Sequence, residues 1–311
     1  MIPASLQECI GDELDRASPA AVAELAAELA RRGGNSTAAV LYYGSTLRAE
    51  NLDGILDFYV LLDDVSAWPG SAFAHLANRL LPPNVGYLEF NTAGQQLRAK
   101  YAVMTLEQFR SRTSLRTLDT TIWARFCQPA LCIWARSKQD RLKAAELVAG
   151  AVITAARWAV ELGPTAAAAG DFWRALFART YAAELRVESS GRARDIVGKS
   201  ADRYAALLPL ALQQLQIGFQ SDAQGLVTPQ VSQTQRLQAE HRWKARARWG
   251  RPLNVLRLLK ASFTFEGAMD YVVWKIERHR GVKINVSPWQ RRFPLLAAPA
   301  LYWQLRRRGI L

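Results

Sequence analysis

The sequence predicts an α/β domain over residues 1–140, a helical domain over residues 141–235 and a basic C-terminal region over residues 236–311. Apolar runs of strand length alternate with helical patches in the first part, whereas helix-like patterns alone follow in the second. The third part is set off by its charge. Residues 1–235 hold 23 basic and 23 acidic side chains, while residues 236–311 hold 17 basic and 4 acidic ones, so the whole formal charge of +13 lies there.

Four strands are expected in the first domain, because apolar runs of strand length end at turn-forming residues. They cover residues 38–43, 55–62, 84–90 and 98–104. Helices are predicted around them over residues 5–32, 70–81 and 105–112. The first helix is Ala-rich and ends at Arg31 and Arg32 before Gly33, where basic residues and a following glycine favour a helix stop.

The helical domain is predicted from three helix-like stretches without strands between them. They span residues 143–162, 171–187 and 196–218, and turn residues such as Gly163 and Pro164 separate them. Residues 221–235 are rich in Gln, Ser and Gly and include Pro229, which predicts a linker or a mobile loop before the basic region.

Composition and spacing exclude several classes of function. Half of the residues are hydrophobic and 22% are charged, which excludes wholesale disorder. Three cysteines form no CxxC pair, and His75, His241 and His279 are scattered, so zinc, Ser-His-Asp and Cys-His sites are not expected. The start of the chain does not resemble a signal peptide, and no run reaches the roughly 18 apolar residues of a membrane-spanning helix.

The most informative local pattern joins Gly44 and Ser45, at the end of one strand, to Asp57 on the next. A Gly-Ser turn that opens a helix offers N–H groups and a hydroxyl to phosphates. A carboxylate on the neighbouring strand can bind Mg²⁺, which bridges to those phosphates. Asp57 lies between Leu56 and Phe58, where an ionised carboxylate is costly unless it is paired or metal-bound. The pattern fits a polymerase-β-like nucleotidyltransferase domain, and equally a plain turn followed by a strand-edge aspartate.

A second metal ligand is less clear from the sequence. The usual pattern places two carboxylates one residue apart on the same strand, but the second position here is Tyr59. Asp63, Asp64 and Glu89 are the candidates that remain. Of these we assign Glu89 to the metal site beside Asp57, because it lies on a strand face that can project into the same cleft. The alternatives are a solvent-facing Glu89 and a pair of turn-forming aspartates.

Five segments together suggest a family. They are Tyr43-Gly44-Ser45; Leu56-Asp57-Phe58 with Asp63-Asp64 and Trp68; Lys100-Tyr101-Ala102-Val103 with Leu106-Glu107; Arg125-Phe126-Cys127-Gln128-Pro129; and residues 262–279 with Glu266-Gly267 and Tyr271. In their order and spacing, from about residue 40 to 280, they resemble the Tam-type phosphatidate cytidylyltransferases. These are the peripheral CDP-diacylglycerol synthases of mitochondria and some bacteria.

The resemblance implies that CTP and phosphatidate react to give CDP-diacylglycerol and pyrophosphate, with Mg²⁺ as the cofactor. It implies that Asp57 and Lys100 act in catalysis and that Gly44, Ser45 and Arg125 bind the nucleotide. It also implies a winged-helix-like unit in the helical domain, beside the cleft. Read from the residues alone, Lys100 fits a strand-surface lysine as well, and Arg125 fits a structural ion pair.

The chain departs from the family pattern at three places. Thr46-Leu47 stands where the family has Gly-Val after the serine, which reduces the backbone freedom of the turn. Ala102 replaces a glycine, and Gln128 replaces a lysine, so one basic substrate contact of the family is missing.

The basic C-terminal region combines arginines with aromatic residues. Residues 293–305 are thirteen uncharged residues, too few to span a bilayer, with arginines on both sides. This composition is typical of a segment that lies in the headgroup plane of an anionic membrane. The expected membrane-binding residues are Trp289, Arg291, Arg292, Tyr302, Trp303, Arg306, Arg307 and Arg308.

Two other interpretations of the basic region stay open. Interleaved Arg and Trp also suit nucleic acid, and a basic helix can simply present a solvated face. The apolar run favours the membrane, so no stable nucleic-acid partner is expected. We therefore expect a peripheral enzyme on the cytoplasmic side of a membrane, of the bacterial inner or mitochondrial inner type. The alternatives are a nucleotidyltransferase for RNA or a soluble acceptor, and a non-catalytic relative that binds nucleotide.

Overall fold

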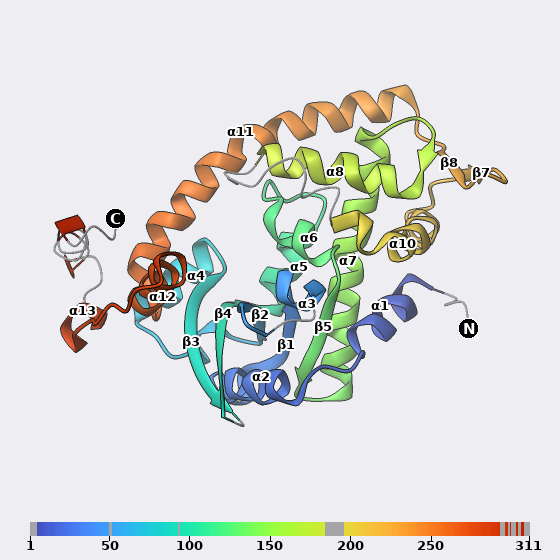
Figure 1. Ribbon diagram of the computed structural model, residues 1–311. Coiled ribbons are helices and arrows are strands. Elements are labelled where there is room, and N and C mark those ends of the chain that lie inside the picture. Colours follow the sequence, from blue (N-terminus) through green and yellow to red (C-terminus); the bar gives the residue numbers. More distant parts are fainter. Residues whose placement is uncertain are drawn as a thin grey trace.

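A five-stranded mixed sheet forms the centre of the first part of the chain (Figure 1). The computed structural model describes residues 5–49, 52–92, 94–183 and 196–292, together with 296, 297, 299, 303, 306 and 307. The strands are β1 (Thr37–Tyr43), β2 (Ile55–Leu62), β3 (Asn84–Thr92), β4 (Gln95–Thr105) and β5 (Ala130–Ala135). Their order is β3-β4-β2-β1-β5, with β2 and β4 parallel and the other neighbours antiparallel.

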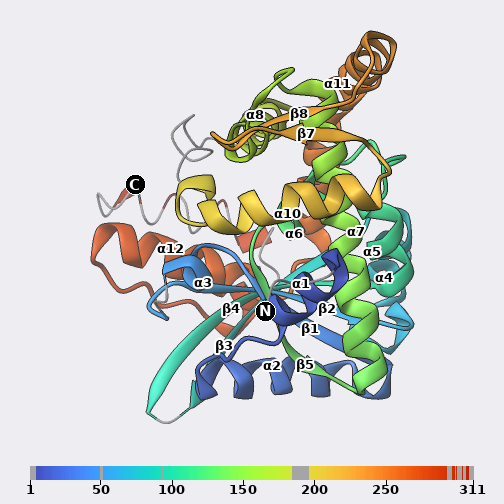
Figure 2. The ribbon, with the colours of Figure 1, turned by 90° about the vertical axis from the view of Figure 1, so that its right-hand side faces the viewer.

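The four predicted strands are confirmed as β1 to β4, and β5 was not predicted. β2 is apolar on both faces because both faces of the sheet are covered. Alternate residues enter two cores: Val40, Phe58 and Val60 pack toward α2 (Ala20–Arg32), whereas Leu41 and Tyr59 pack toward the later helices. Figure 2 shows α2 on its side of the sheet. β5 is a six-residue apolar run between Pro129 and Arg136, of the same length as the run predicted over residues 38–43.

The helix predicted over residues 5–32 is two helices, α1 (Leu6–Leu14) and α2. Pro19 precedes α2 and has an extended backbone with ψ of 141°, so the chain turns between the two. The remaining helices of this part are α3 (Ser45–Ala49), α4 (Ala72–Leu80), α5 (Leu106–Thr113) and α6 (Thr121–Phe126). The predicted helices over 70–81 and 105–112 are thus confirmed as α4 and α5.

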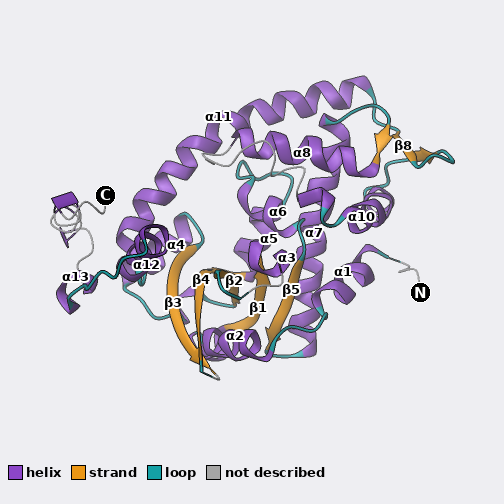
Figure 3. Ribbon diagram, in the orientation of Figure 1, coloured by secondary structure: helices purple, strands orange, loops and turns teal. Residues whose placement is uncertain are grey.

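The helical part contains α7 (Lys138–Leu162), α8 (Ala169–Ala183) and α10 (Ala201–Gln214), which confirm the three predicted stretches as far as they are described. The prediction of no strands here was wrong. β6 (Ala167–Ala168), β7 (Phe219–Ser221) and β8 (Leu226–Pro229) form a second sheet in the order β6-β8-β7 (Figure 3). Residues 221–235 are therefore a hairpin and a helix start rather than a linker. Strands of two to four residues leave no periodicity to detect.

The sheet and the helical part share one hydrophobic core. α7 packs against β1 and β5 on one side and against α8, α10 and α11 on the other. Its Trp158 is fully buried and its Val152 lies in the same cluster as Leu41 of β1. The predicted boundary near residue 140 falls at the start of this shared helix.

A long helix, α11 (Gln233–Thr264), arches over the molecule from the β7–β8 hairpin to α4 and α12 (Ala268–Arg280) (Figure 1). Its basic side chains are tied to oxygens of the elements that it crosses. Arg242 pairs with Glu161 at 3.0 Å, Arg246 donates to Leu115 O at 2.6 Å, and Lys260 Nζ donates to Leu81 O at 2.6 Å. Arg257 forms an ion pair with Asp119, just before α6.

The far end of α11 is fixed to the edge of the sheet. Tyr87 N donates to Glu266 O at 2.8 Å, and Tyr101 Oη donates to Glu266 Oε2 at 2.6 Å. Gly267 follows with φ of 72°, and a Cβ on it would lie 2.6 Å from Tyr87 O. The Glu266-Gly267 pair singled out in the sequence therefore joins α11 and α12 to β3. α13 (Pro288–Arg292) follows α12 along the chain. Within the described part of the chain, no helix is both long and apolar enough to cross a bilayer.

The Asp119–Arg257 pair predicts a change in acid stability. Asp119 is 2% exposed; burial acts to raise its pKa, but Arg257 and the Thr121 hydrogen bonds outweigh burial and lower it. The stabilisation from a depressed carboxyl pKa is complete above the unfolded pKa of about 3.9 and is lost as the pH falls through the folded value. Asp119→Asn should lower the free energy of unfolding at pH 7 by about 3–5 kcal/mol and weaken its decline below pH 4.

Urea unfolding between pH 7 and pH 2.5 measures both effects. The matched control is Asp171→Asn, because Asp171 pairs with Arg174 on the surface, with about half of its side chain exposed. That change should cost no more than about 1 kcal/mol. Equal losses for the two variants would show that the Asp119 pair does not hold α11.

Candidate functional site

The Gly44-Ser45 turn and Asp57 come together where β1 ends. Tyr43 is paired with Asp57 in the β1–β2 ladder, so the turn that follows Tyr43 lies over the Asp57 side chain. Gly44 has φ of 102°, and a Cβ on it would lie 2.7 Å from Asp57 Oδ2. The backbone conformation and the carboxylate each exclude an L side chain at this position. The spacing of Gly44 and Asp57 in the sequence thus corresponds to a direct contact between these two residues.

Three cations surround Asp57. Lys100 is its register partner in the parallel β2–β4 ladder and therefore lies on the same face of the sheet. Burial raises the pKa of the Asp57 carboxyl, and the positive charges of Lys100, Arg125 and Arg48 oppose that rise. The site combines one carboxylate with an excess of positive charge, which favours an anionic ligand such as phosphate.

Two of these cations also contact aromatic rings. Lys100 Nζ lies 5.8 Å from the ring centre of Tyr271 in α12, and Arg125 Nη1 donates to Tyr59 Oη at 3.3 Å. Tyr59 is 1% exposed and packs edge-on against Phe126. A core aromatic residue therefore stands where the usual motif has its second carboxylate.

The structure does not bring Glu89 to Asp57. β4 lies between β3 and β2, and Glu89 is in register with Arg98, which pairs with Ile55 rather than with Asp57. Its carboxylate accepts a hydrogen bond from Tyr87 Oη at 2.8 Å and pairs with Arg98 at 3.5 Å. The side chain is held by these contacts at the edge of the sheet.

Asp63 and Asp64 lie beyond the other end of β2. Asp63 pairs with Arg136 at 2.6 Å, and Asp64 accepts a hydrogen bond from Ser66 N, which caps a short 3₁₀ turn. Among the described residues, no three His, Cys, Asp or Glu side chains gather to hold a metal ion. Asp57 alone still fits Mg²⁺, because Mg²⁺ commonly binds one or two carboxylates together with substrate phosphates and water.

A cavity of about 410 Å³, which we call the α6–α11 cavity, lies next to Lys100 and Arg125. Tyr43 and Tyr59 line it from the sheet side. Its α11 wall is formed by Asn254, Arg257, Leu258, Lys260 and Ala261. Burial together with neighbouring Arg257 and Arg112 lowers the pKa of Lys260 to about 7. The cavity is basic on two sides and apolar between them.

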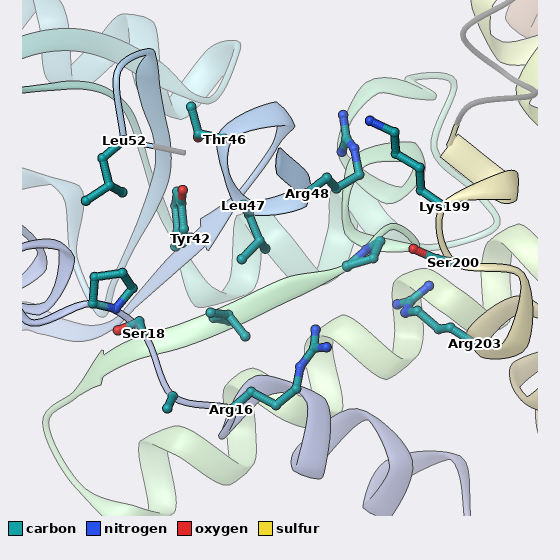
Figure 4. A pocket seen from close by; sticks show the side chains of 14 residues that line it. Arg16, Ser18, Tyr42, Thr46, Leu47, Arg48, Leu52, Lys199, Ser200 and Arg203 are labelled. Atoms are coloured by element: carbon teal, nitrogen blue, oxygen red, sulfur yellow. The ribbon is translucent and has the colours of Figure 1, made fainter. Parts of the chain in front are cut away.

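A larger cavity of about 700 Å³, which we call the α3–α10 cavity, lies on the Arg48 side of Asp57. Figure 4 shows its four basic side chains, which come from separate elements: Arg16, Arg48, Lys199 and Arg203. Its apolar lining includes Leu47, Leu52 and Leu131. No carboxylate is among the described residues that line it.

Sequence reasoning missed the basic residues of the α3–α10 cavity. Arg48 had a local signal, because it lies one turn after Ser45 on the helix that the Gly-Ser turn opens. Lys199 and Arg203 gave no local signal in the sequence. They reach the α3–α10 cavity only because α10 packs on α1 and α7. Arg203 is fixed by an ion pair with Glu13 and donates to Cys127 O at 2.9 Å.

The predicted membrane-binding residues are described in part. Trp289 and Trp303 are 54% and 59% exposed, Arg291 pairs with Asp270 at 2.8 Å, and Arg306 lies 5.9 Å from the Trp303 ring centre. Arg307 is exposed, and the backbone of Arg292 ends α13. Tyr302 and Arg308 lie outside the described residues.

No protein-family model matches the chain, and no curated protein matches it. Among solved structures, one match is the crystal structure of a nucleotidyltransferase-like protein from Exiguobacterium sibiricum. The two chains are 12% identical, and the alignment covers 93% of this chain and 91% of the other with a TM-score of 0.29. At that TM-score the likeness adds nothing to the case for a function, which depends on the residues described above.

The contact between Gly44 and Asp57 predicts a site-specific effect of an added methyl group. Gly44→Ala should cost about 1–3 kcal/mol in the free energy of unfolding, because it combines a strained φ with a clash against Asp57. It should also displace the carboxylate and reduce the binding of an anionic ligand such as phosphate, measured by calorimetry.

The control is Gly150→Ala in α7, where a Cβ would meet nothing within 4 Å. Because this glycine is helical, alanine should stabilise the protein by about 0.5–1 kcal/mol and leave ligand binding unchanged. A Gly44→Ala variant as stable as the parent would contradict the geometry described here.

Proposed function

We propose that the protein transfers a cytidylyl group from CTP to the phosphate of phosphatidate at a membrane surface. The observation that carries the proposal is the Asp57 carboxylate, packed beneath the Gly44-Ser45 turn and surrounded by Lys100, Arg125 and Arg48. A triphosphate and a lipid phosphate are both anions, so cations are needed to offset their repulsion when they meet. The choice of CTP and phosphatidate comes from the resemblance of the segments around these residues to Tam-type enzymes.

In this reaction a phosphate oxygen of phosphatidate attacks the α-phosphorus of CTP. The bond from that phosphorus to the bridging oxygen breaks, and pyrophosphate leaves. The nucleophile is already an anion, so the chain has to supply alignment and charge neutralisation rather than a strong base. Mg²⁺, held by Asp57 together with the triphosphate, supplies additional neutralisation of the phosphate charges. Lys100 and Arg125 draw the two anions together.

The two cavities support separate places for donor and acceptor. The α3–α10 cavity has a volume suited to a nucleotide and joins cations to an apolar wall, so we place CTP there. The α6–α11 cavity lies beside Lys100 and Arg125, so we place the phosphatidate headgroup there. Asp57 lies between them, because its cationic neighbours line both cavities: Arg48 the first, and Lys100 and Arg125 the second.

The topology of the helical part supports the implied winged-helix-like unit. The elements α7, β6, α8, α10, β7 and β8 follow the order helix, strand, helix, helix, strand, strand. Their strands are arranged β6-β8-β7, which leaves β7 and β8 as a hairpin at one edge. In the proposed enzyme the unit presents Lys199, in the turn before α10, and Arg203 of α10 to the nucleotide.

Tyr59 favours a second candidate function, nucleotide binding without transfer. It fills the position of a second carboxylate, and among the described residues no group of three His, Cys, Asp or Glu side chains forms a metal site around Asp57. The two functions differ in one measurement. A binding protein would take up CTP without releasing pyrophosphate when phosphatidate is present.

Asp57→Asn tests the proposed reaction. The amide keeps the shape that fits beneath Gly44 but removes the charge, so the rate of pyrophosphate release should fall by roughly 100-fold or more. Release is measured with CTP, Mg²⁺ and phosphatidate vesicles, and circular dichroism checks the fold. Asp53→Asn is the control, because Asp53 lies exposed before β2. Full activity of Asp57→Asn would refute the role assigned to this carboxylate.

Lys199→Ala tests the placement of CTP. Loss of one cation from a phosphate contact should raise the KM for CTP by roughly tenfold and leave the KM for phosphatidate unchanged. Lys138→Ala is the matched control, because Lys138 is an exposed lysine at the start of α7 and does not line the cavity. If only the KM for phosphatidate rises, then phosphatidate and not CTP binds in the α3–α10 cavity.

A further inference from the structure

The second half of α11 exposes a broad apolar face. Leu256, Leu259 and Phe263 are 51%, 56% and 69% exposed, and their spacing of three and four residues places them on one side of the helix. Trp249, two turns before Leu256, is 50% exposed and continues the same side. Leu258 is also exposed, at 65%, but it lies toward the α6–α11 cavity and is not part of this face. Exposed apolar patches of this kind mark interaction surfaces.

The neighbouring helix adds to this face. α4 exposes Phe73, Leu76 and Leu80, again spaced by three and four residues. The two helices are adjacent, since Lys260 of α11 donates to Leu81 O at the end of α4. A groove of about 360 Å³ lies beside both helices, where Phe263 of α11 and His75 of α4 line it together with residues 65–71 and parts of β3 and β4. We call the exposed residues of both helices the α4–α11 apolar surface.

The charges around the α4–α11 apolar surface are mainly positive, with Glu266 at the groove and Asp64 beside Arg79 of α4 as the acidic exceptions. No Asp or Glu occurs between residues 241 and 265, and none occurs between residues 65 and 88. Lys244, Arg248 and Arg251 are exposed and lie along α11 where the apolar face begins. Arg242, Arg246 and Arg257 are excluded from this count, because each is bound to oxygens within the protein. An apolar centre with a basic border matches the surface of an anionic bilayer.

We propose that the α4–α11 apolar surface docks on the surface of an anionic lipid bilayer. The opposite side of the same helix segment lines the α6–α11 cavity with Asn254, Arg257 and Ala261. A helix lying in the headgroup layer would bring that cavity, with Lys100 and Arg125, to the level of lipid phosphates. The choice of a bilayer as occupant rests in part on the proposed function, whose acceptor is a phospholipid.

Vesicle co-sedimentation of the full chain tests this docking. Leu259→Glu combined with Phe263→Glu places two carboxylates on the surface, where both side chains are exposed and folding does not depend on them. Binding to vesicles of phosphatidylglycerol and phosphatidylcholine should fall at least about tenfold. Leu237→Glu, on the same helix but before the surface, is 62% exposed and should bind like the parent. Parent binding should also weaken with salt and on pure phosphatidylcholine.

Three results would overturn the docking proposal. The first is unchanged vesicle binding by the double variant, and the second is binding that is lost only on removal of residues 288–311. The third is a dimer of the parent that the double variant converts to a monomer while vesicle binding stays the same, which would make the surface a contact between two copies.

Calorimetric CTP binding and pyrophosphate release separate this proposal from the proposed function. If the double variant binds vesicles normally but Asp57→Asn is inactive, the docking surface fails and the reaction stands. If the parent releases no pyrophosphate but needs the α4–α11 apolar surface for vesicle binding, the reaction fails and the docking stands.

Discussion

The buried ion pair between Asp119 and Arg257 is the constraint on which much of the structure depends. Asp119 is almost fully buried, so its charge must be matched, and the match comes from a helix 138 residues later in the chain. The same helix ties Arg242 to Glu161 and Lys260 to the carbonyls that follow α4. The cations on its inner side are bound to oxygens of the protein. α11 therefore forms one wall of the α6–α11 cavity and exposes its apolar side.

A second close contact fixes the chemistry of the site. The Gly44 turn and the Asp57 carboxylate approach too closely for any side chain between them, which holds the carboxylate at the end of the sheet among three cations. Because three cations stand beside a single carboxylate, the site favours anionic ligands. Tyr59 is buried against Phe126 two residues after Asp57, so an aromatic ring stands where the usual motif has a second carboxylate.

The sequence predicts the features that neighbouring residues determine, but not the contacts between residues far apart in the chain. Strands β1 to β4 and the approach of Gly44 to Asp57 follow from short apolar runs, turn residues and register, all of which are local. The break at Pro19 is a local effect that the helix prediction overlooked, whereas the two-residue β6 is decided by tertiary packing. Arg242 and Arg257 belong to the basic C-terminal region, and nothing near them in sequence shows that Glu161 and Asp119 will pair with them. The place of Lys199 in the α3–α10 cavity also depends on a contact between distant parts of the chain, because it follows from the packing of α10.

The account turns on whether the nucleotide is transferred to a lipid. The most direct measurement incubates the full chain with CTP labelled at the α-phosphorus, Mg²⁺ and phosphatidate vesicles, and then follows the label into the organic phase. The account predicts label in a lipid, with one pyrophosphate released for each labelled lipid and no transfer when the label is at the γ-phosphorus. CTP binding without any label in the lipid phase would contradict it.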